Sequence, residues 1–398
     1  MKRALNIAAV VTEYRKYSHA QHIVDRFLYG YGWNGKHHRP AMQIVSMYTD
    51  QCPESDLSRD REREFDQLKI YPTVAEALTR GGDSLAVDGV LLIGEHGDYP
   101  TNEKGQRLYP RYELFQQITS VFRDSGRSVP VFNDKHLSWN WRWAEEMVAT
   151  ARELNFPLLA GSSLPLARRL PELEIPRDAK IKEVMSVALG SPDSYDFHAL
   201  EVIQSMVERR VGGETGVISM HALKGKAVWD AMATESWDAG GWDPQLLEGC
   251  LSRSHKLKSA RDTYSHRFPT LAELRAQHPN PVAYRFQYAD GLKATMLLAD
   301  GLVSDFTFAA KIESQPKPVS TLMFLPYYDL QNFFSPQVNQ IEKLFQSGQP
   351  AYPIERTLLT TGLTAAGVDS LFRGQRRIMT PHLRFAYQPA DESTYWRT

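Results

Sequence analysis

Short apolar runs alternate with segments of helical periodicity over the first 160 residues. The runs predict strands at Leu5–Val11, Gln43–Tyr48, Gly89–Ile93, Val129–Phe132 and Leu158–Ala160. The spacing between them predicts helices at Ser18–Tyr29, Thr73–Arg80, Tyr112–Asp124 and Ser138–Leu154. Nearly continuous apolar strands joined by helical crossovers are typical of a parallel sheet covered on both faces. The pattern therefore predicts an α/β, Rossmann-like, doubly wound domain over residues 1–162.

The pattern changes after Ser162. A helix is predicted near Asp196–Arg210, and five later segments are rich in β-branched and aromatic residues: GVISMHAL, VAYRFQYADG, LKATMLLADG, VSDFTFAAKI and VSTLMFLPYY. Asp290-Gly291 and Asp300-Gly301 predict turns of an antiparallel meander. The polar segment Ser252–Pro279 is expected to be a surface excursion, and helices are expected at Gln337–Gln346 and Leu358–Phe372. We predict an α+β domain over residues 163–398 with an open, mostly antiparallel sheet, whose last helices are free to pack back on the first domain.

Composition narrows the kind of partner. Lys and Arg (46) nearly balance Asp and Glu (47), so the charge indicates neither nucleic acid nor a membrane surface, and we expect a small-molecule partner. Cys52 and Cys250 form no CxxC pair, which argues against structural zinc or a disulfide framework and fits a reducing compartment. The segment MKRALNIAAVVTEY lacks the small-residue cleavage site of a signal peptide, and no window has the eighteen apolar residues of a membrane helix. We therefore expect a cytoplasmic protein.

Polar residues follow every predicted strand of the first domain. In open α/β sheets, ligands bind beyond the carboxyl ends of the strands, so these positions are candidate site residues. They are Thr12, Glu13 and Tyr14; Asp50; Glu95, His96 and Asp98; Asn133, Asp134, Lys135 and His136; and Ser162 and Ser163. Any one of them alone is more often a helix cap or turn former. It is their convergence on one edge of the sheet that indicates a site.

The loop after the first strand lacks the glycines of a dinucleotide site. No glycine stands between Val10 and Gly30, although glycine normally lets the backbone approach the pyrophosphate at a helix N-terminus. Glu13 would repel phosphates, and Arg15 and Lys16 would offset part of that repulsion. Asp50, in contrast, stands where an acidic residue would accept hydrogen bonds from the adenosine ribose. The sequence therefore contains half of the pattern expected for NAD.

Several segments, in order along the chain, resemble the glucose-fructose oxidoreductase, inositol dehydrogenase and MocA (Gfo/Idh/MocA) family. VFNDKHLSWNWRWAEEMVATARELNFPLLAGSSL resembles the region of the family's Glu-Lys-Pro motif, with Asp134-Lys135-His136 in place of that tripeptide. IYPTVAEALTRGG, VDGVLLI, FFSPQVNQIEKLFQSGQP and TLLTTGLTAAGVDSLFRGQRR resemble further family segments. SPDSYDFHALEVIQSMVERR resembles the first helix of the second domain and puts His198 at the family's catalytic histidine. The family's Asp four residues earlier is Ser194 here, so Asp193 or Asp196 is its nearest substitute.

The resemblance implies an oxidoreductase acting on a sugar, cyclitol or related polyol with NAD or NADP. It implies that Lys135 polarises the substrate hydroxyl and that His198 is the acid/base, with His96 and Asp196 beside them. The implied cofactor-binding residues are Thr12, Glu13, Tyr14, Asp50, Gly94, Glu95 and Asp134. Because sheets of this family commonly pack face to face between subunits, a homo-oligomer is also expected.

Two alternatives stay open. The first is a non-redox lyase, hydratase or isomerase acting on a keto-sugar. Its acid/base groups, or its ligands for a divalent metal such as Mn, Fe or Zn, would be Glu95, His96, Asp98, His136 and His198. The second is a non-catalytic ligand-binding protein whose cofactor site has decayed, which the densely polar strand ends disfavour.

Overall fold

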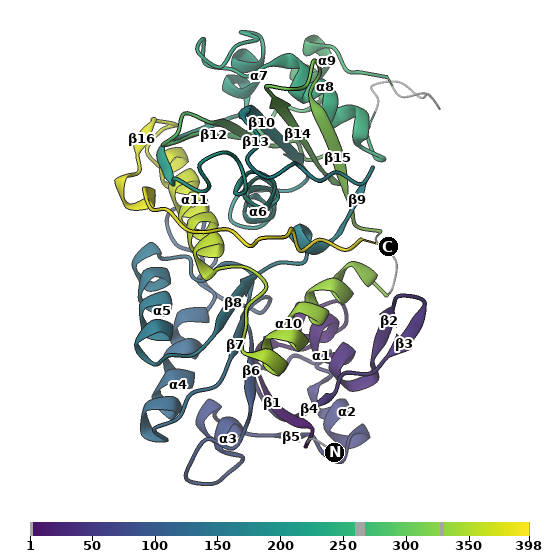
Figure 1. The fold of residues 1–398 in the computed structure, drawn as a ribbon, viewed down its shortest axis with the longest axis vertical. Helices are drawn as coiled ribbons and strands as arrows, with labels where there is room; N and C mark the ends of the chain where they lie inside the picture. Colours follow the sequence, from purple (N-terminus) through teal and green to yellow (C-terminus); the bar gives the residue numbers. More distant parts are fainter. Residues whose placement is uncertain (1–2, 259–266, 327–329, 398) are drawn as a thin grey trace.

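A six-stranded, all-parallel sheet forms the lower half of the molecule in Figure 1. The computed structural model describes residues 3–258, 267–326 and 330–397. The strands lie in the order β5 (Lys69–Ile70), β4 (Met42–Gln51), β1 (Leu5–Glu13), β6 (Gly89–Ile93), β7 (Val131–Asp134) and β8 (Leu158–Gly161). The direction in which strands are added reverses between β1 and β6, as in doubly wound dinucleotide-binding folds. The predicted parallel sheet is confirmed. The strand expected at Val129–Phe132 begins at Val131, because Pro130 has no N–H to donate to the ladder.

Helices cover both faces of this sheet. One face packs on α1 (His19–Tyr29) and α10 (Ser335–Ser347), through side chains such as Ile7, Val338 and Ile341. The other face packs on α3 (Val74–Thr79), α4 (Arg111–Asp124) and α5 (Trp141–Glu153). The short helix α2 (Ser58–Glu64) and a hairpin of β2 (Tyr31–Trp33) and β3 (Lys36–His38) complete this half. Of the last two helices, α10 therefore packs on the first sheet.

An eight-stranded sheet forms the upper half. Its order is β16 (Ile378–Met379), β11 (Val217–Lys224), β12 (Val282–Tyr288), β13 (Lys293–Leu298), β10 (Ile181–Ala188), β14 (Phe306–Ile312), β15 (Val319–Phe324) and β9 (Arg168–Leu170). Among these neighbours only β10 and β13 are parallel. The face that looks toward the first sheet packs on α6 (Asp196–Val207) and α11 (Ile354–Phe372). Short 3-10 turns lie at Leu164–Leu166, Asn332–Phe334 and Pro381–Leu383. The mostly antiparallel second sheet is confirmed.

One of the two predicted meander turns is wrong. Asp290-Gly291 joins the antiparallel pair β12 and β13, as expected. Asp300-Gly301 follows β13, but β14 does not pair with β13 because β10 lies between them. An Asp-Gly signal reports a local chain reversal and cannot report which strand fills the neighbouring place. Of the segment VSTLMFLPYY, Tyr327 and Tyr328 lie outside the described residues.

The outer face of the second sheet is covered by this chain's own helices. These are α7 (Lys226–Met232), α8 (Pro244–Arg253) and α9 (Leu271–Gln277), at the top of Figure 1. Trp229, Trp242 and Leu246 are buried between these helices and the sheet. The described parts of Ser252–Pro279 are mostly exposed, as expected of a surface excursion, although Leu274 of α9 is buried in this layer; residues 259–266 lie outside the description. The expected homo-oligomer would bring the open sheet faces of two subunits together, but in this chain α7, α8 and α9 cover that face. The homo-oligomer stays a prediction.

The C-terminal tail, residues 384–397, runs along the junction of the two sheets (Figure 1). Near its end, Trp396 stacks on Trp33 of β2, with ring centroids 5.3 Å apart. The backbone N–H of Trp396 donates to the carbonyl of Leu166, 2.9 Å away, in the segment that links the two sheets. The tail thus fastens the β2–β3 hairpin to that linking segment.

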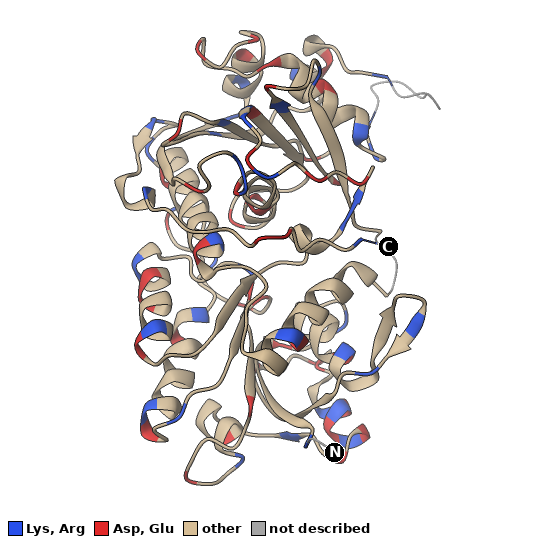
Figure 2. Cartoon of the chain, viewed as in Figure 1, with Lys and Arg blue, Asp and Glu red and all other residues tan. Residues whose placement is uncertain are grey.

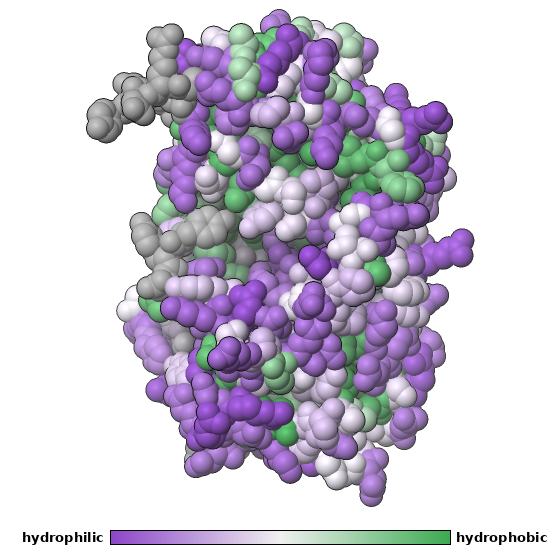
Figure 3. All heavy atoms as spheres, turned by 180° about the vertical axis from the view of Figure 1, so that it is seen from behind, coloured by the Kyte–Doolittle hydropathy of each residue, from purple (hydrophilic) through white to green (hydrophobic). Residues whose placement is uncertain are grey.

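The surface carries both signs of charge. In Figure 2, Lys and Arg are interspersed with Asp and Glu over both halves, and α2 carries the two signs side by side. From the opposite side, hydrophilic residues cover most of the first half and apolar residues form small patches (Figure 3). None of the helices in the described ranges is long and apolar enough to cross a membrane.

Candidate active site

A pocket of about 270 Å³ lies where the carboxyl edge of the first sheet faces α6. Its polar lining includes His19, His22, Glu95, His96, Lys135 and His198. Its apolar wall is formed largely by Phe306, Leu325, Phe333 and Phe334. The strand-end residues Glu95, His96 and Lys135 therefore do meet, and α6 brings His198 to them from the other half of the molecule.

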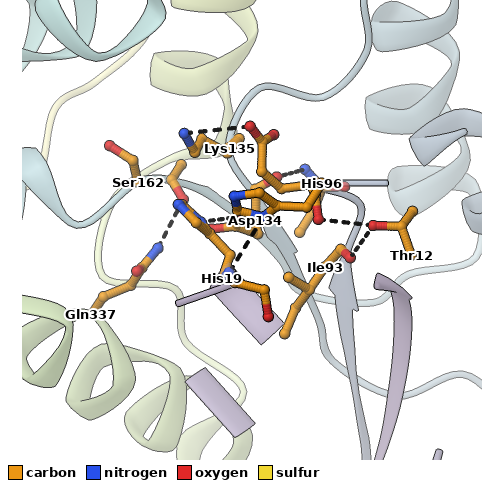
Figure 4. Close-up of polar contacts among 12 residues, drawn as sticks. Thr12, His19, Ile93, His96, Asp134, Lys135, Ser162 and Gln337 are labelled. Carbon is orange, nitrogen blue, oxygen red and sulfur yellow. Dashed lines mark hydrogen bonds and ion pairs between the residues drawn. The ribbon is translucent and has the colours of Figure 1, made fainter. Parts of the chain in front are cut away.

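Lys135 is aimed across the pocket by its backbone (Figure 4). The strand β7 ends at Asp134, and Lys135 turns out of it with a φ of 69° while its N–H donates to the carbonyl of Gly161, 3.1 Å away. Its Nζ lies 2.6 Å from Nε2 of His198 and 3.7 Å from Oε1 of Glu95. The lysine thus joins a carboxylate of the first half to an imidazole of the second.

Four residues of the pocket wall adopt the left-handed backbone conformation. Tyr17, His96, Lys135 and Gln331 have φ values of 65°, 73°, 69° and 40°. This conformation is unfavourable for residues other than glycine, and such strain gathers at sites where the surrounding structure fixes a side chain for function. The backbone thus supports the assignment of this pocket as the functional site.

Arg111, at the start of α4, holds Glu95 in place. Its side chain is fully buried, and its guanidinium forms an ion pair with Glu95 and donates to Nε2 of His136 across 3.0 Å. Burial alone would raise the pKa of Glu95, but the charges of Lys135 and Arg111 hold it below the ordinary value. Glu95 is therefore ionised at neutral pH. His136 points at Arg111 and does not line the pocket.

His198 is held from behind by a serine and a second glutamate. Its Nδ1 lies 2.9 Å from Oγ of Ser162, and Ser162 donates its hydroxyl to Glu201. Lysine is only a donor, so Nε2 of His198 must be the acceptor and Nδ1 must carry the hydrogen. Burial and the nearby charge of Lys135 lower the pKa of His198 well below its ordinary value, so the ring is neutral. Its bare Nε2 is a base that faces the pocket.

Asp196 does not support His198. One carboxylate oxygen accepts from the N–H of Phe197, 2.9 Å away, and the other accepts from the hydroxyl of Tyr284, 3.0 Å away. Residues two apart in a helix point to different sides, so Asp196 faces away from His198. The role expected of Asp196 falls instead to Ser162 and Glu201.

Two histidines of α1 complete the pocket. The prediction from the strand ends did not include them. Nδ1 of His19 lies 2.7 Å from Oδ2 of Asp134 (Figure 4), and His22 stacks on Phe334 with ring centroids 4.7 Å apart. Burial lowers the pKa of His19 well below its ordinary value and that of His22 to about 4, while burial raises the pKa of Asp134 to about 6. The only sequence signal was the segment SHAQH directly after the first loop.

Comparison with solved structures identifies the fold. Neither the family models nor the curated protein sequences give a match. GenD2 from gentamicin A biosynthesis, solved with NAD, is 13% identical with a TM-score of 0.59, over 95% of this chain and 97% of its own. The myo-inositol dehydrogenase of Lactobacillus casei, solved with NAD(H) and myo-inositol, is 8% identical with a TM-score of 0.56, over 94% and 96%. The chain has the Gfo/Idh/MocA fold.

The Gfo/Idh/MocA fold includes structures with other substrates as well. Biliverdin reductase from Synechocystis, solved with biliverdin and NADP+, is 11% identical with a TM-score of 0.50, over 92% of this chain and 98% of its own. Identities this low show the fold and not the activity.

The nucleotide crevice of a Gfo/Idh/MocA fold would lie at the ends of β1 and β6, and here side chains of this chain bridge it. The hydroxyl of Tyr99 donates to Asp50 across 2.6 Å, and Tyr48 donates to the other oxygen across 2.7 Å. The side chain of Gln51 accepts from the N–H of Asp98 (2.8 Å) and donates to its carbonyl (3.1 Å). We call these four residues, Asp50, Gln51, Asp98 and Tyr99, the clasp. It ties the loop after β6 to the end of β4.

The remaining residues expected to bind the cofactor also have partners within the protein. Thr12 donates to the carbonyl of Glu95 across 2.9 Å, and Glu13 forms an ion pair with Arg15. Tyr14 is fully buried and donates to Asp25. A side chain at Gly94 would have its Cβ 2.5 Å from Cγ of Arg111, so this glycine makes room for the arginine. With no glycine loop and a clasped crevice, these residues do not fit a dinucleotide held in the usual extended way.

The metal ligands of the alternative hypothesis are not assembled. Asp98 is exposed in the clasp, and His136 lies against Arg111. Over residues 3–258, 267–326 and 330–397, no group of three or more His, Cys, Asp or Glu side chains is close enough to hold a metal ion. Glu95, His96 and His198 are left as candidates for proton transfer.

Gly161, at the end of β8, leaves no room for a side chain beside Glu201 and Tyr352. Its φ is +130°, and an added Cβ would lie 2.7 Å from Oε1 of Glu201 and 2.9 Å from the hydroxyl of Tyr352. We expect Gly161→Ala to lower the free energy of unfolding by about 1–3 kcal/mol, because it adds both overpacking and backbone strain. Urea unfolding followed by circular dichroism measures this. Gly32→Ala, with no atom within 4 Å of the added Cβ, is the matched control and should change stability by under about 0.5 kcal/mol.

Proposed function

We propose that the chain is an oxidoreductase that acts on a hydroxyl group of a small polyhydroxylated molecule, such as a sugar, a cyclitol or a related polyol. In this proposal Lys135 holds the substrate oxygen and His198 takes its proton. The observation that carries it is the 2.6 Å contact between Nζ of Lys135 and Nε2 of His198 inside the 270 Å³ pocket. The structural neighbours that are named for inositol oxidation support the same class of substrate.

The charge of the pocket favours a neutral, hydroxylated ligand. Burial is the largest cause lowering the pKa of His19, His22, His96 and His198, so each imidazole is neutral near pH 7. A neutral imidazole offers one donor and one acceptor, which matches the two roles of a hydroxyl group. The one lysine of the pocket already faces Glu95. An anionic ligand would meet that carboxylate, whereas a polyol would not.

The proposed proton transfer uses groups already in position. A substrate hydroxyl placed between Lys135 and His198 would accept a hydrogen bond from the ammonium and donate its own hydrogen to Nε2. The ammonium stabilises negative charge as it develops on the oxygen, and His198 receives the proton. Phe306, Phe333 and Phe334 line the same pocket and keep water from the reacting groups.

Oxidation of an alcohol also requires an acceptor for hydride. NAD or NADP would supply that acceptor when bound, as implied by the resemblance and by the neighbours solved with these cofactors. The clasp and the loop after β1 do not present the usual nucleotide contacts. The proton transfer described above uses only the side chains of Lys135 and His198.

Binding of a polyol is the direct test of the substrate class. We expect myo-inositol or a member of a panel of neutral sugars to bind the wild-type protein in calorimetric titration. The variant Lys135→Met should bind at least about tenfold more weakly, equal to about 1.4 kcal/mol, since it loses a charge-assisted hydrogen bond. Equal binding by both proteins, or binding of anionic sugars only, would contradict the proposal. Lys180→Met, which replaces an exposed lysine directly before β10 and outside the pocket lining, is the matched control.

The clasp favours a second candidate, proton transfer without hydride transfer. A dehydration or isomerisation of a keto-sugar needs only a base and a group that stabilises negative charge, and His198 and Lys135 are such a pair. Titration of wild-type protein and of Tyr99→Ala with NAD(H) and NADP(H) separates the two candidates. Binding by either protein supports the oxidoreductase, and a tighter complex with Tyr99→Ala would show that the clasp opposes it. No binding at millimolar cofactor by both proteins would overturn the oxidoreductase in favour of the second candidate.

A further inference from the structure

A continuous line of hydrogen bonds leads away from the pocket behind His198. It runs from Nδ1 of His198 to Oγ of Ser162, 2.9 Å away, and from there to the carboxylate of Glu201. The backbone N–H of Ser162 donates to the same carboxylate, 3.1 Å away. His198 and Glu201 are three residues apart on α6 and so share one face of that helix. The serine fills the gap between them from the end of the first sheet.

The direction of each bond in this line follows from its neighbours. Lys135 donates to Nε2 of His198, so Nδ1 bears the ring hydrogen and donates to Ser162. The hydroxyl of Ser162 accepts that hydrogen and donates its own to Glu201. All three donors therefore point from the pocket toward the glutamate.

We infer that Glu201 is the final acceptor of the substrate proton, which His198 takes up at Nε2 and Ser162 passes on. The inference rests on the proposed function and adds two positioning residues that act through His198. As the substrate O–H proton binds Nε2, the proton on Nδ1 moves to Oγ of Ser162 and the serine proton moves to Glu201. The net change is one proton from substrate to Glu201; His198 ends neutral with its hydrogen on Nε2, and Ser162 is again a hydroxyl.

The surroundings of Glu201 suit a group that gains and loses a proton. Its side chain is 1% exposed, and burial raises its pKa to about 7 against the opposing effects of Ser162, Arg356 and Lys135. Arg356 is already paired with Glu208, and the hydroxyl of Tyr352 donates to the carbonyl of Ala160, 3.0 Å away. Within the part of the chain that the structure describes, no ion pair therefore fixes Glu201 in its charged form.

Gly161 leaves room for this carboxylate. The residue ends β8 directly before Ser162, and a Cβ there would collide with Oε1 of Glu201. The strand end thus accommodates the glutamate that lies behind the catalytic histidine.

Nitrogen NMR of histidine-labelled protein tests the inference without any substrate. The ring signals of His198 are assigned by their loss in His198→Asn. In wild-type protein we expect hydrogen on Nδ1, a bare Nε2 and a step in the Nδ1 shift near pH 7, where Glu201 titrates. In Glu201→Gln the amide oxygen still accepts from Ser162, so the hydrogen should stay on Nδ1 while the pH step disappears. In Ser162→Ala the step should disappear and the hydrogen should no longer be confined to Nδ1.

Ser205→Ala is the matched control, since Ser205 lies on the same helix, outside the pocket lining, and its hydroxyl donates to the carbonyl of Val202, 3.1 Å away; both features should persist in it. A pH step that survives in Glu201→Gln, or a wild-type His198 with its hydrogen on Nε2, would overturn the inference. If Glu201→Gln does not fold, Ser162→Ala decides alone, and a spectrum unchanged from wild type then overturns the inference. These spectra do not depend on polyol binding, so failure of the proton line and failure of the proposed substrate class give separate results.

Discussion

Replacing His198 by asparagine is expected to lower kcat by about 10²–10⁴-fold, because the pocket then loses the base that lies against Lys135. The amide of asparagine can still accept a hydrogen bond from Lys135, so binding of the polyol selected by calorimetry should change little. Turnover of that polyol, measured for wild type and variant, tests this. A fall in affinity with kcat preserved would show that His198 binds the substrate and does not act as its base.

The pH profile gives a second measure of the same residue. Only the neutral imidazole accepts a proton, and burial places the pKa of His198 well below its ordinary value. Protonation of His198 should therefore not limit activity near the ordinary histidine pKa of about 6.5. The decline expected as pH falls through about 7 belongs instead to Glu201, whose protonated carboxyl cannot accept the proton that Ser162 passes on. His278→Asn, a substitution outside this pocket, is the control and should keep both kcat and the profile.

Replacing Arg111 by methionine is expected to lower the free energy of unfolding by about 3–5 kcal/mol, the usual result of removing one partner from a buried ion pair. Arg111 is fully buried, and without it Glu95 would face Lys135 alone while His136 would lose its donor. Urea unfolding at pH 7 measures the loss. Adding Glu95→Gln to Arg111→Met should not recover the loss, because the double variant leaves the buried ammonium of Lys135 without its carboxylate partner.

Arg123→Met is the matched control on the same helix. Arg123 is largely exposed and faces Glu153 across 3.5 Å, so the pair should contribute under about 1 kcal/mol. If Arg123→Met costs as much as Arg111→Met, then burial of the ion pair is not the source of the effect.

The prediction from the strand ends identified the site residues that the parallel sheet brings together. Carboxyl ends of neighbouring parallel strands meet at one edge, so Glu95, His96 and Lys135 had to come together once their strands were identified. The family resemblance added His198, whose contact with Lys135 joins the two halves of the molecule. In each case the position along the backbone was sufficient to place the residue.

Side-chain direction was harder to predict from sequence. Tyr14 and Asp196 were named for their positions, yet Tyr14 turns under α1 to Asp25, and Asp196 turns to Tyr284. Arg111 was missed because an arginine in the first turn of a helix is usually solvated, and only the fold shows that it is buried. Glu201 could have been found: it lies three residues after His198 on an apolar helix, where an acidic residue needs a buried partner.

Burial was also hard to predict from sequence on the outer face of the second sheet. The polar segment Ser252–Pro279 predicts a surface excursion, yet its helix α9 buries one side, through Leu274. One buried side is enough to pack a helix into this layer, and a count of charged residues does not reveal it.

The C-terminal tail has a consequence for how ligands enter. Rotation of one half of the molecule away from the other would pull Trp396 off Trp33 and break its bond to Leu166. A hinge-like opening of the junction is therefore opposed by the last residues of the chain. We expect ligand entry to depend on small local movements of pocket residues such as Tyr17 and Gln331. Truncation of the tail should allow larger rotations between the two halves.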